Sequence, residues 1–121
     1  MKMPGPDHPI SIEPNPHLVR IVLGGVIVAE TTRALTLREA TMPPVLYIPR
    51  EDAEMDLFAP SSHVTHCEYK GDARYFDLTA GGIVAKNAAW SYEKPYPNVR
   101  EIAGHLAFYS NKVDAIEELR D

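Results

Sequence analysis

The residues best suited to chemistry are concentrated in one short segment, residues 63–71 (HVTHCEYKG). This segment contains two imidazoles, a thiol, a carboxylate, a phenol and an amine. In an extended strand, alternate side chains face the same side. The segment would then have two faces, with His66, Glu68 and Lys70 on one and Cys67 and Tyr69 on the other.

Each face offers a different kind of chemistry. An imidazole beside a lysine in a cleft suits a general base or a clamp for an anion, which makes His66 and Lys70 candidates. Cys67, next to His66, is a candidate nucleophile. However, neighbours on a strand point to opposite faces, and a free cysteine is most often a small core residue. Packing is therefore the favoured role of Cys67, with nucleophilic attack as the alternative.

Metal and anion binding are two further readings of the same segment. His63 and His66, together with Cys67 or the distant His105, would supply metal ligands, but their spacing matches no recognised ligand pattern. We predict no metal site and identify no cofactor. Lys70, ahead of a glycine in a turn, would suit a phosphate or a carboxylate. The sequence lacks the longer glycine-lysine phosphate loop.

A pair of carboxylates forms a second candidate cluster. Asp52 and Asp56 are four residues apart and would share one face of a helix, which suits acid–base work or a hard cation. The alternative, which we favour, is a solvated helix start in which Asp52 caps a turn. The aromatic side chains would line either a pocket or the core, and a buried phenol or indole then needs a hydrogen-bond partner; they are Tyr47, Trp90, Tyr92 and Tyr109.

Length and composition limit the class of protein. A chain of 121 residues, 45% apolar and 24% charged, fits one globular domain. A single cysteine excludes an internal disulfide and suits a reducing compartment, so we expect a cytoplasmic protein. The net charge of −5 disfavours a nucleic-acid partner. No apolar run approaches the ~20 residues of a membrane span, and the N-terminal stretch does not resemble a secretory signal.

The first 17 residues differ from the rest of the chain. They contain five prolines, which disfavour regular structure and bias the backbone toward extended geometry. This segment is either a disordered terminus or an arm lying across the body, and we give both equal weight. The argument for the arm is that Ile10 and Ile12 alternate as in a buried strand edge. We expect one domain over residues 18–121.

Short β strands dominate that domain. Two glycine pairs, Gly24-Gly25 and Gly81-Gly82, each separate two apolar runs and predict hairpins. We do not infer an internal duplication, because the flanking residues do not match. Further strands are expected at 33–39, 45–48 and 107–109, with an extended stretch at 55–58 and a loop at 60–62. A helical turn is expected at 49–55 and a helix at 99–104, capped by Asn98. Residues 113–120 are expected to form a polar turn or helix. The pattern predicts a mainly β fold, either a small antiparallel barrel or a two-sheet sandwich, with one or two short helices.

Four motifs resemble those of a known family of small bacterial and fungal proteins, domain of unknown function 427. They are Val45–Asp52 (VLYIPRED), Thr65–Gly71 (THCEYKG), Ala89–Tyr92 (AWSY) and Ile102–Tyr109 (IAGHLAFY), and the match runs from Val19 to Val113. The chain departs from the family at Glu68, where proline is usual and would stiffen the loop, and at Ile48, where an aromatic is usual. The family also carries a nucleotidyltransferase-like label. The sequence has neither the glycine-serine loop nor the Asp-x-Asp pair that metal-dependent nucleotidyl transfer uses.

Two hypotheses about function follow, and the sequence leaves open whether the protein is an enzyme. In the first, a pocket binds a small anionic molecule that Arg50 and Lys70 orient, while His66 or Asp52 moves a proton. The wall of that pocket would be built from Tyr47, Cys67, Tyr69, Trp90 and Tyr92. In the second, the protein is a non-catalytic interaction module or a homodimer joined along strand edges, and the motif residues are structural.

Overall fold

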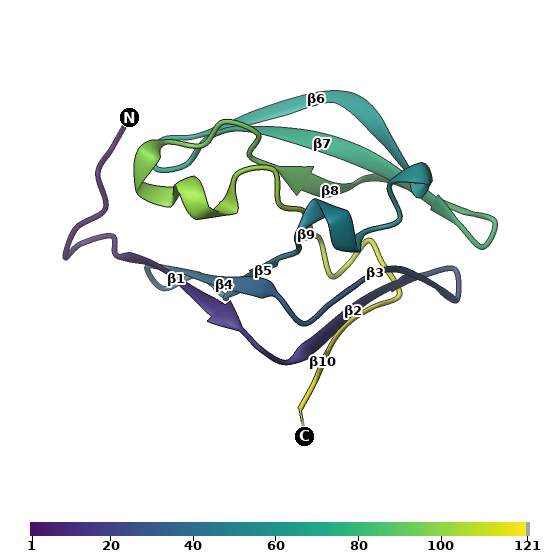
Figure 1. Cartoon of the computed structure of the whole chain (residues 1–121). Helices are drawn as coiled ribbons and strands as arrows, with labels where there is room; N and C mark the ends of the chain where they lie inside the picture. The colour runs from purple at the N-terminus through teal and green to yellow at the C-terminus, as the bar shows by residue number, and fades with distance from the viewer. Residues whose placement is uncertain (121) are drawn as a thin grey trace.

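Antiparallel strands in two layers make up the fold in a computed structural model, which describes residues 1–120 (Figure 1). One layer is a four-stranded sheet with the order β6-β7-β8-β9, and the other holds two three-stranded sheets with the orders β1-β4-β5 and β10-β2-β3. The strands are β1 (Ile10–Asn15), β2 (Leu18–Leu23), β3 (Val26–Thr31), β4 (Ala34–Glu39), β5 (Val45–Tyr47), β6 (Phe58–Cys67), β7 (Gly71–Ala80), β8 (Ile83–Ser91), β9 (Ala107–Phe108) and β10 (Ala115–Leu119). The predicted mainly β fold is confirmed, and of the two predicted architectures the sandwich is the observed one.

Both predicted glycine hairpins are present. Gly24-Gly25 joins β2 to β3, and Gly81-Gly82 joins β7 to β8. All four glycines have φ between 56° and 79°, the left-handed region that a two-residue hairpin loop requires. The local sequence therefore determines these two turns.

The alternation of buried and exposed residues in β7 is irregular where its pairing with β8 is also irregular. The register between β7 and β8 shifts between Phe76 and Leu78, and two consecutive side chains, Tyr75 and Phe76, are both buried. The step from Phe76 to Leu78 lies opposite the longer step from Ala89 to Ala85, so the extra residues form a bulge in β8. Beside it, the rings of Tyr75 and Phe76 enter different clusters of the core. The side chain of Asp77 stabilises the bulge by accepting a hydrogen bond from the backbone N–H of Asn87 at 2.8 Å.

The predicted helical turn at 49–55 is a 3-10 helix, η1 (Arg50–Asp52), preceded by Pro49. Residues 55–58 were expected to be extended, which is wrong for their first part, because η2 (Met55–Leu57) is a second 3-10 helix. The loop predicted at 60–62 is also wrong, because it lies within β6. Pairing of β6 with β7 is interrupted between Pro60 and Val64, since proline cannot donate a ladder hydrogen bond.

Two predictions in the C-terminal third are wrong. The helix there is η3 (Pro97–Ile102), which follows Tyr96 and has no side-chain cap, so Asn98 lies inside it and does not cap it. Residues 113–120, expected to form a polar turn or helix, instead provide β10, which pairs with β2. Burial against a neighbouring strand outweighs the helix propensity of a Glu-rich run.

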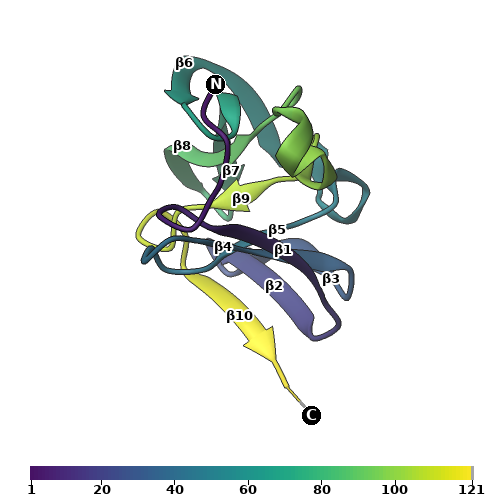
Figure 2. The ribbon, with the colours of Figure 1, turned by 90° about the vertical axis from the view of Figure 1, so that its left-hand side faces the viewer.

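The N-terminal segment is attached to the body of the domain. Residues 10–15 form β1, which pairs with β4, with Ile10 and Ile12 half-buried. Ahead of β1 the chain rises along the edge of the sandwich toward the end of β6 (Figure 2). There the backbone N–H of Lys2 donates to the carbonyl of Glu68 at 2.7 Å.

Two hydrophobic clusters fill the space between the layers. The larger one surrounds Ile21, Ile48, Phe76 and Leu78, and the second, next to η3, contains Leu37, Tyr47, Tyr75, Tyr92, Val99 and Ile102. Cys67, the last residue of β6, packs against the second cluster. No helix among residues 1–120 is long and apolar enough to cross a membrane.

Candidate functional site

The segment that carries most of the candidate chemistry folds into a strand end and a turn. Strand β6 ends at Cys67, which is paired with Gly71 at the start of β7, and residues 68–70 form the turn between them. The prediction that His66, Glu68 and Lys70 share one face is therefore wrong. His66 lies on the outside, while the side chain of Lys70 turns inward and is only 10% exposed.

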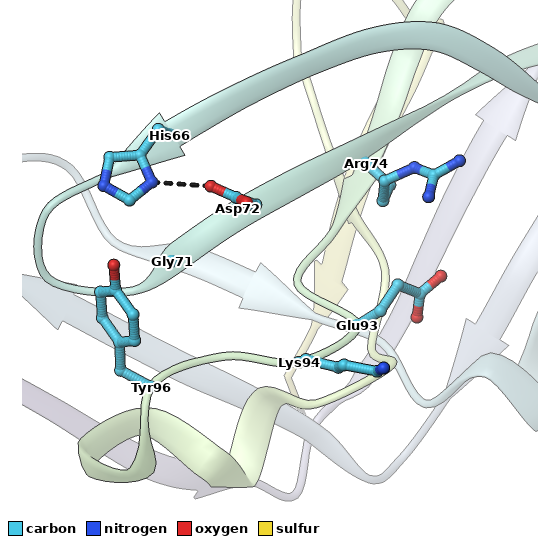
Figure 3. A pocket seen from close by; sticks show the side chains of 7 residues that line it. All are labelled: His66, Gly71, Asp72, Arg74, Glu93, Lys94 and Tyr96. Carbon is cyan, nitrogen blue, oxygen red and sulfur yellow. Dashed lines mark hydrogen bonds and ion pairs between the residues drawn. The ribbon is translucent and has the colours of Figure 1, made fainter. Parts of the chain in front are cut away.

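His66 lies at the edge of a surface groove of about 380 Å³. Six side chains from β6, β7 and the segment before η3 surround it: His66, Asp72, Arg74, Glu93, Lys94 and Tyr96 (Figure 3). The imidazole Nδ1 lies 2.6 Å from the Asp72 carboxylate. Because an ionised carboxylate only accepts hydrogen bonds, Nδ1 carries the proton in the neutral ring and Nε2 is left as an acceptor. Nε2 lies 4.0 Å from the Glu68 carboxylate, beyond hydrogen-bond reach.

The charges in the groove are unequally paired. Asp72 is engaged by His66, and Glu93 accepts a hydrogen bond from Arg50 Nη2 at 3.0 Å. Within residues 1–120, neither Arg74 nor Lys94 forms an ion pair. The ion pairs at the groove are Arg50–Glu93 and His66–Asp72. Two exposed cations without carboxylate partners therefore line a groove whose carboxylates are already engaged.

Backbone contacts hold the opposite wall of the groove in place. The N–H of Tyr96 donates to the carbonyl of Lys70 at 3.0 Å, which fixes the Lys94–Tyr96 segment against the turn. The prolines on either side of Tyr96, Pro95 and Pro97, restrict the backbone further. Gly71 has a φ of 107°, a conformation that side-chain-bearing residues rarely adopt, so the turn that opens the groove depends on this glycine.

Lys70 belongs to a buried polar network on the inner side of the same turn. Its ammonium pairs with the buried carboxylate of Glu39, whose other oxygen lies 2.7 Å from His8 Nε2. The His8 ring stacks on Tyr69 with 3.8 Å between ring centres and an angle of 8°. Burial alone would raise the pKa of Glu39, but hydrogen bonds and charge from Lys70 and His8 outweigh it and lower that pKa.

Buried aromatic residues surround this network. The Lys70 ammonium lies 5.8 Å from the ring centre of Tyr92, and Tyr92 packs in the same cluster as Tyr47. Burial raises the pKa of both phenols, so both stay neutral at physiological pH. Cys67 and Trp90 are half-buried against this cluster.

Asp52 lies apart from both the groove and the network. Its carboxylate accepts a hydrogen bond from the Thr31 hydroxyl at 2.6 Å and one from Arg33 Nη2 at 3.1 Å. The bond from Thr31 is the main reason that its pKa is lowered, and burial opposes the shift less strongly than Thr31 and Arg33 favour it. Asp52 makes no side-chain cap, so the favoured capping role is wrong, and Asp56 lies in a separate 3-10 helix, η2.

The predicted site residues thus fall into three groups. His66 lines the groove, and Arg50 reaches it through Glu93. A second group lies around the buried ion pair, and Asp52 is alone in the third. The second group consists of Tyr47, Cys67, Tyr69, Lys70, Trp90 and Tyr92.

Sequence reasoning missed several members of these sites. In β4, Leu35, Leu37 and Glu39 alternate, which places Glu39 on the inner face and was a usable signal for a buried carboxylate. Asp72 and Arg74 alternate on the outer face of β7 in the same way. Nothing in the local sequence indicates that Lys94 and Tyr96 would meet them.

The family model of Domain of unknown function (DUF427), which bears the label NTP_transf_9, matches residues 11–119. The chain belongs to the DUF427 family. Comparison with curated proteins finds no match. In this DUF427 chain the central motif, Thr65–Gly71, supplies both the edge of the groove and the inner ion pair. Among residues 1–120, no three His, Cys, Asp or Glu side chains are grouped so as to hold a metal ion.

Proposed function

We propose that this DUF427 chain binds a small anionic molecule in the groove beside His66. The observation that carries the proposal is the placement of Arg74 and Lys94, which line the groove and have no carboxylate partners in the described chain. Guanidinium and ammonium groups are the usual ligands of carboxylates and phosphates. The volume of about 380 Å³ lies within the range of small-molecule sites.

In this proposal each group has a distinct role. Arg74 and Lys94 bind the anionic part of the ligand, and the Tyr96 phenol offers a hydrogen bond. His66, held by Asp72 through Nδ1, presents Nε2 as an acceptor that would take a proton from a bound substrate. A carboxylate that orients an imidazole in this way is a recurring feature of general bases. We place the protein in the cytoplasm because its single cysteine suits a reducing compartment.

The proposed anion site lies at Arg74 and Lys94 and not at Lys70. The Lys70 ammonium is paired with Glu39, so an incoming anion would have to displace a buried carboxylate. Lys70 instead positions the groove, since its carbonyl holds Tyr96. Arg50 acts indirectly by neutralising Glu93.

A titration with inorganic phosphate and pyrophosphate, followed by amide chemical shifts, tests this function. We expect saturable shifts at Asp72, Arg74 and Tyr96. Charge-assisted hydrogen bonds contribute roughly 1.5–3 kcal/mol, so removing both cations in R74Q/K94Q should weaken binding at least about tenfold. The matched control is K86Q, because Lys86 is an exposed lysine on β8 that does not line the groove. Equal affinity of R74Q/K94Q and K86Q would show that the groove is not the anion site.

A second candidate function, an interaction module or homodimer, is favoured by a separate observation. Four apolar side chains near the two hairpin tips are 38–58% exposed: Val26, Ile27, Ile83 and Val84. Among the described residues, β9 pairs only with Ala89 and Trp90 of β8, so residues 83–87 have no strand partner on that side, although Lys112 Nζ donates to the carbonyls of residues 86 and 87. Exposed apolar residues beside a free edge are typical of pairing surfaces. Light scattering tests this candidate function. If the protein is a monomer at all concentrations, the homodimer is excluded.

A further inference from the structure

A second cavity, of about 540 Å³, lies between the two layers of the sandwich. Strands β2, β5 and β10 contribute side chains from one layer, and β8 and β9 contribute side chains from the other. The loop before β5 and the segment after β9 close one end, where they come together at the left edge of Figure 2. The cavity shares no lining residue with the groove beside His66.

The lining of this cavity is uncharged. None of its eleven residues is Asp, Glu, Lys or Arg, although 24% of the chain is charged. The rings of Trp90 and Tyr109 form an aromatic wall, with 4.5 Å between their centres and a tilt of 44°. The half-buried side chains of Leu46 and Ile116 provide aliphatic surface. A charged ligand would lose its hydration here without gaining a counter-charge from any lining residue. The ammonium of Lys112 lies 5.2 Å from the centre of the Tyr109 ring but does not line the cavity.

The polar groups are few and neutral. The Tyr109 hydroxyl lies 3.2 Å from the Tyr75 hydroxyl, which lies 3.1 Å from the hydroxyl of Thr65. Burial, followed by the bond to Tyr75, raises the pKa of Tyr109 to about 12, so the phenol carries no charge at neutral pH. Ser110 provides a second hydroxyl at the exposed rim.

We propose that this cavity binds a small, uncharged, mainly apolar molecule that contains an aromatic ring. The volume is typical of small-molecule sites, and an apolar lining with few polar groups is their usual composition. The aromatic wall suits an offset-stacked or edge-to-face ring. Met42, an exposed and flexible side chain at the mouth, adapts to ligands of different shape. The cavity opens to solvent at the edge of the sandwich, and its walls come from two different layers, so it suits an inserted molecule better than the flat face of another protein.

Binding can be followed from within the site, because Trp90 is the only tryptophan of the chain. The probe is N-phenyl-1-naphthylamine, a neutral aromatic dye that accepts excitation energy from indole. We expect saturable energy transfer from Trp90 at one dye per chain. Amide shifts should concentrate on Leu46, Tyr109 and Ile116.

Two serine variants provide a matched comparison. S110F places a ring at the rim of the cavity and should weaken dye binding at least tenfold. S62F introduces the same ring at an exposed serine of β6 outside the cavity and should bind the dye as the parent protein does. The thermal midpoint of both variants is measured to establish that they are folded. Equal dye affinity of S110F and S62F, or amide shifts concentrated at the exposed hairpin residues Ile83 and Val84, would overturn the proposal.

Discussion

Gly24 and Gly81, 57 residues apart in the sequence, touch through their backbones. A Cβ placed on Gly24 would overlap the carbonyl oxygen of Ala80, and one placed on Gly81 would overlap the carbonyl oxygen of Gly24. The two glycine hairpins therefore meet tip to tip, one from each layer of the sandwich. Each of these two glycines is required twice, by its positive φ and by this contact.

Because of this contact, we expect alanine substitution to lower the unfolding free energy by different amounts at the two glycines of one turn. Gly24 and Gly25 both have positive φ, but no atom lies within 4 Å of a Cβ on Gly25. We expect G25A to cost about 1–2 kcal/mol of unfolding free energy, the penalty of a left-handed alanine. G24A should cost roughly 1–3 kcal/mol more, because the two tips must also separate. Urea unfolding measures both values, and equal costs would show that the tips move apart freely.

The buried Glu39–Lys70 pair predicts a strong interdependence of its two members. K70M leaves the Glu39 carboxylate buried with His8 as its remaining partner, and we expect a loss of about 3–5 kcal/mol in unfolding free energy. The double variant E39L/K70M should lose less than the sum of the single variants, since it leaves no unpaired charge. K86M is the control, because the Lys86 side chain is 78% exposed and its ion pair with Asp77 should contribute under about 1 kcal/mol. Additive costs in the double-mutant cycle would contradict a coupled pair.

The lowered pKa of Glu39 predicts a pH dependence of stability. A carboxylate with a depressed folded-state pKa contributes stability that is present above its ordinary value of 4.5 and is lost as the pH falls through the folded value. The gap in unfolding free energy between the parent protein and E39Q should therefore narrow as the pH falls below 4.5. Comparing the two proteins at each pH cancels the contribution of other carboxylates, such as Asp52. A gap that stays constant from pH 7 to pH 3 would rule out this linkage.

Cys67 provides a test of packing against nucleophilic reactivity. Its side chain is half-buried against the cluster that contains Tyr47 and Tyr92. We expect iodoacetamide to alkylate the native protein at least ten times more slowly than the urea-unfolded chain, because reaction requires an accessible thiolate. C67A should bind phosphate as the parent protein does, since Cys67 does not line the groove. Rapid alkylation of the folded protein would instead support the nucleophile hypothesis.

Local chemistry in the sequence was sufficient to predict much of the fold. The glycine pairs fix two hairpins because few other residues adopt positive φ, and the β-branched run at residues 18–23 correctly indicated the strand β2. The four sequence motifs together also identified the family correctly. The C-terminal strand could not be predicted in this way, because residues 115–119 are extended through pairing with β2, almost a hundred residues earlier.

The composition of the sites was decided only by tertiary structure. A turn at residues 68–70, which a strand pattern does not indicate, sends Lys70 inward to Glu39 and leaves His66 outside with Asp72. The partners of Lys70 depend on the register of β4 and on where the N-terminal segment lies, and both are set by packing between layers. Hairpin geometry depends on a few adjacent dihedral angles and can be predicted from the local sequence. Contacts between distant side chains depend on the whole arrangement of strands, which only the folded chain establishes.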